Sequence, residues 1–232
     1  MSAIPKPVNE PILNFSPGSP ERTSLQAKLK ELSTKEIEIP LIIGGKEVRT
    51  GDTGTCVMPH NHGHVLARFH QAGPKEVVQA IDAAKAAWAD WSRTPLEARA
   101  QVFLKMAKLL AGPYRDTVNA ATILNMSKNA FQAEIDAACE LIDFWNFNCH
   151  YAREFHEQYQ PLVSPTGVKN STEIRPLEGF VLAVTPFNFS SIAANLPSAP
   201  AILGNTAVWK PSRHSYHSKY VLMELMMEAG LP

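Results

Sequence analysis

The stretch GFVLAVTPFNF, residues 179–189, and the stretch TAVWKPS, residues 206–212, decide the fold of this chain. Each contains a short, continuous apolar run. The first run is bounded by Gly179 and Pro186, which is typical of a strand buried on both faces of a parallel sheet. We therefore predict two parallel strands and an α/β fold class for this part of the chain.

The segments after the two strands are predicted to be helices. Residues 188–203 are rich in small side chains, although Pro197 and Pro200 should interrupt the helix. Residues 218–232 form a second helical pattern that ends at Gly230. The order strand, helix, strand, helix starts a doubly wound domain, and two strands cannot complete such a sheet. We therefore expect the chain to be the front part of a longer protein.

The preceding residues predict a mainly helical region with short strands. Five prolines make the first twenty residues extended, and Leu25, Leu29 and Leu32 then follow at helical spacing. The runs IPLII and KEV flank Gly44-Gly45, which predicts a hairpin, and residues 60–69 suggest another strand.

Four helical patterns follow before residue 153. The first begins at Pro74, the second ends at Gly112, and the fourth has an apolar stripe that includes Ile135 and Trp145. We divide the chain into an extended arm (1–20), a helical region with short strands (21–178) and the first β-α-β-α half of a domain (179–232).

The composition excludes several classes of function. Apolar residues make up 45% of the chain, and 22 Lys and Arg balance 22 Asp and Glu. A neutral chain without a basic block predicts no nucleic-acid partner and no membrane partner. Three cysteines do not make a disulfide framework, which favours a reducing compartment. The N-terminus resembles neither a secretory signal nor a mitochondrial presequence. We expect a cytoplasmic protein, or a mitochondrial matrix protein in mature form.

Asn188 follows the first predicted strand, at the edge where open α/β sheets bind ligands. Its amide could donate a hydrogen bond to a developing oxyanion, or it could cap the next helix. Lys210 and Ser212 end the second strand and could hold the ribose or phosphate of a nucleotide, or they could simply be solvated. No G-x-G-x-x-G motif follows either strand.

These motifs together resemble the aldehyde dehydrogenase superfamily. The segments NEPIL, GSPER, NHGH, QAEIDAACELIDFWNFN, LEGFVLAVTPFNF and WKPS are similar to its delta-1-pyrroline-5-carboxylate dehydrogenase branch, from about Asn9 to Pro232. The resemblance implies a Rossmann-like NAD-binding domain, of which this chain supplies the first half after an N-terminal helical region. It also implies NAD-dependent oxidation of glutamate semialdehyde to glutamate, by a homo-oligomer that is a dimer or larger.

The resemblance assigns catalytic and substrate roles to three residues. Asn188 matches the asparagine that stabilises the tetrahedral oxyanion. Phe189 matches a phenylalanine that packs on the aliphatic part of the substrate, and Glu140 matches an acidic residue at the substrate tunnel.

The resemblance assigns the cofactor to residues after the two strands. Lys210 matches the lysine that binds the adenosine ribose of NAD. The same cleft would be lined by Thr185, by Ser212 and by the backbone of Pro186 and Phe187.

The family's nucleophilic cysteine and its general-base glutamate have no match here, and we expect both downstream of Pro232. Cys139 and Cys149 lie on an apolar helical face, where a cysteine is usually inert. The fragment alone would then be inactive. Two alternatives stay open: a dehydrogenase for another aldehyde, and a truncated chain without catalysis that binds a partner. The alternating His60, His62 and His64 have no acidic or cysteine neighbour, so we expect no metal.

Overall fold

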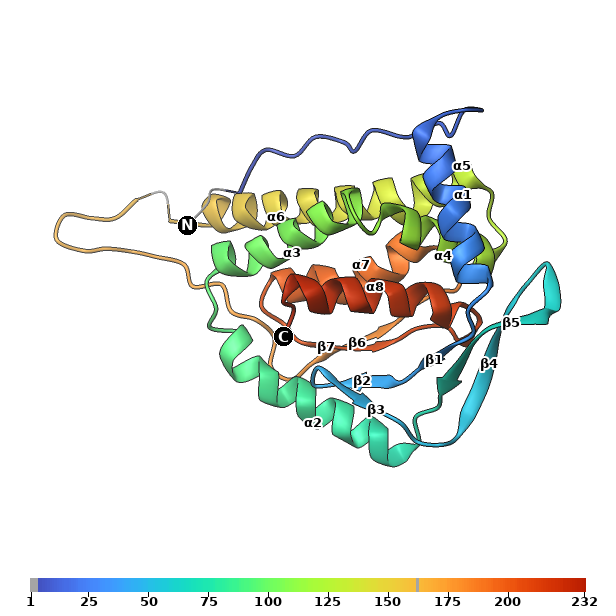
Figure 1. Ribbon diagram of the computed structural model, residues 1–232. Coiled ribbons are helices and arrows are strands. Elements are labelled where there is room, and N and C mark those ends of the chain that lie inside the picture. Colours follow the sequence, from blue (N-terminus) through green and yellow to red (C-terminus); the bar gives the residue numbers. More distant parts are fainter. Residues whose placement is uncertain (1–3, 162) are drawn as a thin grey trace.

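A computed structural model of the chain describes residues 4–161 and 163–232 (Figure 1). The helices are α1 (Pro20–Ser33), α2 (Pro74–Trp91), α3 (Leu96–Ala111), α4 (Arg115–Met126), α5 (Ala130–Ala133), α6 (Glu140–Gln158), α7 (Ser190–Ile202) and α8 (Tyr216–Ala229), with a π-helical segment η1 (Glu134–Cys139) and a 3-10 turn η2 (Arg213–Ser215). The strands are β1 (Ile37–Ile39), β2 (Leu41–Ile43), β3 (Lys46–Val48), β4 (Thr53–Met58), β5 (Asn61–His70), β6 (Val181–Val184) and β7 (Ala207–Lys210). Within the described ranges, no helix is long and apolar enough to cross a membrane.

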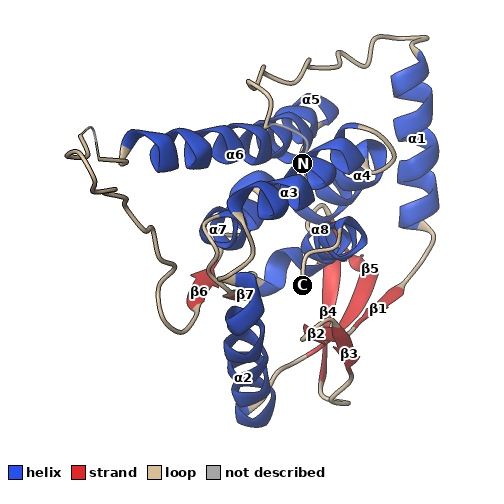
Figure 2. Cartoon of the chain, turned by 90° about the vertical axis from the view of Figure 1, so that its left-hand side faces the viewer, coloured by secondary structure: helices blue, strands red, loops and turns tan. Residues whose placement is uncertain are grey.

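The main core lies among the helices. α3 contacts α6 and α8, and α6 also contacts α7, so that these four helices form one packed group (Figure 2). Trp145 of α6 is fully buried there, and its indole Nε1 donates a hydrogen bond to Ser198 Oγ at 3.1 Å. The β6–β7 pair lies beneath α7, so this core supports the ends of both strands.

Several sequence predictions are confirmed. α1 begins at Pro20, and β2 pairs with β3 in antiparallel fashion. Gly44 and Gly45 form the hairpin turn with φ of +57° and +72°, values that two-residue hairpins require and that glycine adopts without strain. Gly230 ends α8 in the left-handed conformation.

β6 and β7 are parallel, with Val184 opposite Lys210, as predicted. Within these 232 residues, β6 is buried on one face only, so the expected burial on both faces is not seen here. Ala183 faces α7 and is buried, whereas Leu182 is 59% exposed and Val184 57% exposed. α2 contacts β7 on the other side of the pair, and Leu182 and Val184 of β6 stay uncovered within these residues.

The prolines of α7 do not interrupt it, contrary to expectation. The helix runs from Ser190 through Pro197 and Pro200 to Ile202, although each proline removes one backbone donor. Ala193 and Ala194 are fully buried against the neighbouring helices. This tertiary packing outweighs the loss of the backbone hydrogen bonds.

The fourth predicted helix is divided by η1. The wider π-helical turn shifts the phase of the side chains, so that Ile135 is exposed and does not belong to the predicted apolar stripe. Glu134 and Asp136 are buried instead. Such segments often mark functional sites, because they turn polar side chains toward the interior.

The N-terminal arm is extended and lies across α6 (Figure 1). Ile4 is 3% exposed and joins the main core, and its carbonyl accepts a hydrogen bond from Arg153 at 2.6 Å. The amide of Leu13 donates to Glu134 at 2.9 Å, and Arg115 forms ion pairs with both Glu10 and Glu134. The arm is therefore held by buried charges on η1 and α4.

Candidate active site

The loops that follow β6 and β7 lie side by side. The amide of Thr185 donates to the carbonyl of Lys210 at 3.2 Å, and Trp209 Nε1 donates to Thr185 Oγ1 at 2.9 Å. The ring of Phe187 lies edge-on to that of His214, with centroids 6.4 Å apart. The structure therefore brings the two stretches together at the carboxyl edge of the strands, where α/β sheets bind ligands.

Asn188 is exposed between β6 and α7. α7 begins at Ser190, its N-cap residue is Phe189, and no side chain caps it. The interpretation of Asn188 as a helix cap is therefore wrong. Within the described part of the chain its amide has no hydrogen-bond partner, so the amide is free to meet a ligand at the strand edge.

Phe189 lies beside a lysine that the sequence analysis did not identify. The ammonium of Lys128 lies 4.1 Å from the centre of the Phe189 ring, and it forms an ion pair with Asp136. Burial raises the pKa of Asp136, and the ion pair with Lys128 opposes that shift. The cation over the ring fixes one face of Phe189 next to Asn188.

Glu140 is brought to the same place by η1 and α6. Ser191, in the first turn of α7, donates to Glu140 Oε2 at 2.5 Å and to Asp136 Oδ1 at 3.2 Å. Phe189 and Glu140 are far apart in the sequence. The structure places Phe189 at the N-cap of α7 and Glu140 within hydrogen-bond distance of Ser191 in the first turn of that helix. Ser191 lies in a helix rich in small residues, and Asp136 lies in a π-helical turn. Neither feature leaves a distinct sequence pattern, so the sequence could not identify these two residues.

Lys210 is exposed at the end of β7, and Ser212 is half-buried two residues later. A cleft of about 400 Å³ extends from this edge between the β2–β3 hairpin, α2 and α8, with Lys210 and Pro211 in its lining. A lysine and a serine beside an open cleft suit the hydroxyl groups of a ribose, because both side chains donate hydrogen bonds. Thr185 is 5% exposed, and its hydroxyl already accepts from Trp209.

The three cysteines do not supply a nucleophile. Cys56, Cys139 and Cys149 are buried, and burial raises the pKa of the Cys139 and Cys149 thiols to about 12. A thiol of such high pKa is almost entirely protonated near neutral pH and reacts poorly. These positions agree with the prediction that Cys139 and Cys149 are inert.

The alternating histidines have separate partners. His60 Nδ1 lies 2.8 Å from Ser127 Oγ, and His64 Nε2 lies 2.8 Å from the Ser33 carbonyl. Among residues 4–161 and 163–232, no group of three metal-binding side chains is found.

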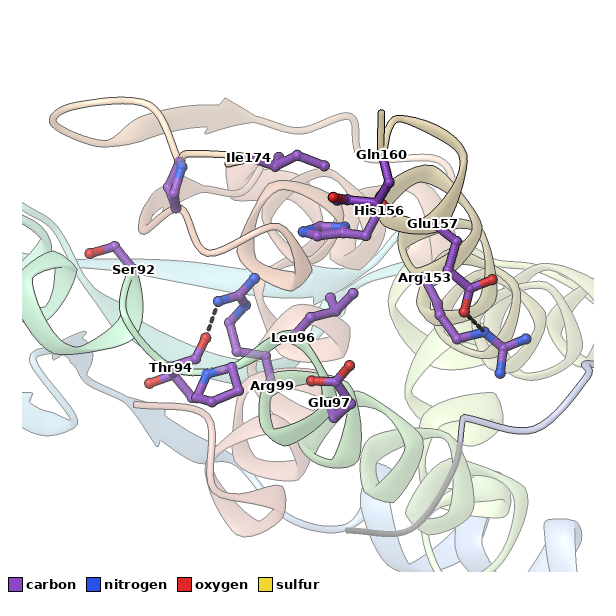
Figure 3. A pocket seen from close by; sticks show the side chains of 12 residues that line it. Ser92, Thr94, Leu96, Glu97, Arg99, Arg153, His156, Glu157, Gln160 and Ile174 are labelled. Atoms are coloured by element: carbon purple, nitrogen blue, oxygen red, sulfur yellow. Dashed lines mark hydrogen bonds and ion pairs between the residues drawn. The ribbon is translucent and has the colours of Figure 1, made fainter. Parts of the chain in front are cut away.

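A second groove, of about 470 Å³, lies between the start of α3 and the end of α6. Arg99 and His156 point into it (Figure 3). Arg99 is held by the carbonyls of Ile202 and Thr94. None of the predicted site residues lines this groove, so it is separate from the strand edge.

Comparisons with known proteins identify the family of the chain. The aldehyde dehydrogenase family model matches residues 48–232. Delta-1-pyrroline-5-carboxylate dehydrogenase of Agaricus bisporus is 47% identical over 230 residues, which cover 99% of this chain and 42% of that protein. The human mitochondrial enzyme of the same name is 47% identical over 227 residues, covering 98% of this chain and 40% of that protein.

The solved structures agree as well. Delta-pyrroline-5-carboxylate dehydrogenase from Mycobacterium tuberculosis, bound with NAD, matches with a TM-score of 0.96 and 47% identity, over 100% of this chain and 43% of that one. A Thermus thermophilus 1-pyrroline-5-carboxylate dehydrogenase matches with a TM-score of 0.91 and 27% identity, over 100% of this chain and 44% of that one. The chain thus spans about two fifths of the length of these relatives, and it belongs to the aldehyde dehydrogenase family.

Proposed function

We propose that this chain is the N-terminal part of an NAD-dependent dehydrogenase that oxidises glutamate gamma-semialdehyde, formed from delta-1-pyrroline-5-carboxylate, to glutamate in proline breakdown. The observation that carries the proposal is the free amide of Asn188 at the strand edge, beside Phe189 and near Glu140. The names of the relatives, which match almost the whole of this chain, support the same substrate.

Asn188 would act on the carbonyl oxygen of the aldehyde. That oxygen gains negative charge when a nucleophile adds to the carbonyl carbon, so a hydrogen bond from the Asn188 amide strengthens as the reaction proceeds. Phe189 would pack on the aliphatic part of the substrate, with its other face held by Lys128. The carboxylate of Glu140 would lie along the path to the carbonyl.

Lys210 and Ser212 would hold the adenosine ribose of NAD, and Thr185 with the backbone of Pro186 and Phe187 would line the same cleft. When bound, NAD supplies the acceptor for the hydride of the aldehyde. The thiolate nucleophile and the glutamate that activates water would come from parts of the protein outside these 232 residues, because the three cysteines present are buried.

The remaining architecture follows the same proposal. Residues 1–20 would be an arm, residues 21–178 a helical region with short strands, and residues 179–232 the first half of the NAD-binding domain. The whole protein would be a homo-oligomer in the cytoplasm, or in the mitochondrial matrix like the relatives named as mitochondrial.

The test is the turnover of the full-length protein with NAD on three substrates: glutamate semialdehyde, succinate semialdehyde and a simple aliphatic aldehyde. We expect the highest kcat/KM for glutamate semialdehyde. Faster use of another aldehyde would replace the substrate assignment. Absence of turnover on all three would favour a chain that only binds partners.

A further inference from the structure

Lys219 of α8 is a buried lysine without a carboxylate partner. Its side chain is 1% exposed, and its Nζ lies 3.4 Å from each of three atoms: Ser190 Oγ, Ser218 Oγ and Met126 Sδ. Within the described ranges, no carboxylate lies within ion-pair distance of this nitrogen. A buried lysine with such neighbours is rare, because an ammonium taken out of water is costly unless it is paired.

Among the residues that the structure describes, the charges around Lys219 do not supply a counter-ion. Asp136 of η1 is the anion that favours the ammonium, but it already forms an ion pair with Lys128. Lys128 itself repels a second cation there. The neighbouring groups Cys56 and His217 are uncharged near neutral pH, since burial raises the pKa of the Cys56 thiol and lowers the pKa of His217 to about 4.

The Lys219 amine lies at the N-terminus of α7. That helix end carries partial positive charge, which further disfavours the charged form of the lysine. Burial lowers the pKa of Lys219 to about 7.

The two stronger acceptors around Lys219 match in number the two hydrogens of an uncharged amine. Ser218 Oγ donates to the Ser215 carbonyl at 3.1 Å, so toward Lys219 it acts as an acceptor. A neutral amine has two hydrogens, and the two serine oxygens can accept both. The third hydrogen of an ammonium would face only the sulfur of Met126, which is a weak acceptor.

Ser190 connects this amine to the predicted site. It is the first residue of α7, it is fully buried, and its Oγ also lies 3.0 Å from Thr122 Oγ1. Asn188 lies two residues before it. The first turn of α7 is thus held from one side by Lys219 through Ser190, and from the other by η1 and α6 through Ser191.

We propose that Lys219 is a positioning residue for Asn188: as an uncharged amine it holds the first turn of α7, and its protonation displaces that turn and lowers turnover in mildly acidic solution. The proposal rests on the assignment of Asn188 to the oxyanion in the preceding section. Lys219 also lines the cleft beside Lys210, and the proposal concerns its contact with Ser190.

The test compares the full-length wild-type protein with Lys219→Met, which keeps the length of the side chain and removes the charge. Lys85→Met, at an exposed lysine of α2, is the matched control. In the wild type and the control, kcat should fall about fivefold to tenfold from pH 8 to pH 6, as the amine takes up a proton. In Lys219→Met the fall of kcat from pH 8 to pH 6 should be at least about threefold smaller than in the control, because only the titration of the nucleophile and of the general base remains, with the KM for NAD unchanged. An equal pH profile in all three proteins would overturn the proposal.

Two further measurements separate this proposal from a purely structural role. In an Asn188→Ala background, Lys219→Met should no longer alter the pH dependence of kcat, because its effect passes through Asn188. An undiminished effect of Lys219→Met in that background would overturn the proposal. Should Lys219→Met not fold, hydrogen exchange in wild-type residues 189–195, corrected for intrinsic rates, decides the question. Exchange must be faster at pH 6 than at pH 8, and equal protection overturns the proposal. Hydrogen exchange needs no turnover. Failure of the substrate assignment can therefore be distinguished from failure of the Lys219 proposal.

Discussion

Replacement of Asn188 separates the two roles that its position allows. The side chain is exposed, makes no hydrogen bond within the described part of the chain, and does not cap α7. Asn188→Ala should therefore change the free energy of unfolding by less than about 0.5 kcal/mol, the usual range for a surface substitution. A helix cap would instead lose about 1 kcal/mol.

Catalysis should respond on a different scale. Removal of one oxyanion donor costs about 2.7–4 kcal/mol of transition-state stabilisation, which is about a hundredfold to a thousandfold in kcat. Asn188→Asp keeps the shape of the side chain but places a negative charge toward the oxyanion, so kcat should fall at least as far. The same carboxylate lies near the positive end of α7, where it stabilises the helix by about 0.3–1 kcal/mol. The aspartate variant should thus be inactive and as stable as the wild type, or more stable.

The assay is steady-state formation of NADH by the full-length protein, together with thermal unfolding of the same samples. A reduced melting temperature with unchanged kcat in Asn188→Ala would refute the reasoning. An aspartate variant that retained the wild-type kcat would refute it too.

Three other perturbations test the described interior. Glu134→Gln turns the charged acceptor of the Leu13 amide into a neutral one and removes a counter-charge of Arg115, so hydrogen-exchange protection of that amide should fall at least about tenfold; exposed Glu97→Gln should leave it unchanged. Cys149, whose thiol pKa is raised to about 12 by burial, should stay unmodified by iodoacetamide at pH 8 in the folded protein and react after denaturation, as peptide mass spectrometry would show. Burial lowers the pKa of His217 to about 4, so the unfolded state binds more protons between pH 4 and 6.5. Unfolding free energy should therefore decrease by about 3 kcal/mol as pH falls through that window, and His217→Leu should lose this dependence.

Local patterns predicted most of the elements. The leucine spacing of α1, the Gly44-Gly45 turn and the Gly230 cap each depend on residues close together in the chain, and each was confirmed. β4 was missed, because its sequence TGTCVM shows no clear alternation and it owes its place to pairing with β5. Elements that depend on contacts between residues far apart in the chain are harder to predict from local sequence patterns.

The errors have the same origin. The prolines of α7 were expected to break the helix, but buried alanines and the neighbouring helices hold it together. The exposure of Ile135 depends on the π-helical turn, which shifts the periodicity by which the apolar stripe was read. At the candidate site, the position after a strand indicated Asn188, and the family resemblance added Phe189 and Glu140. The neighbours Lys128, Asp136 and Ser191 of Phe189 and Glu140 are visible only when the loop after α4, η1 and α7 are brought together.

The N-terminal arm has a consequence for protein synthesis. Ile4 is bound by Arg153, a residue made 149 positions later, and Leu13 is bound by Glu134, made 121 positions later. This segment therefore cannot dock until η1 and α6 have emerged from the ribosome and folded. During translation the arm is an exposed, extended segment that a chaperone or a protease can reach. It docks only when the helical region has folded.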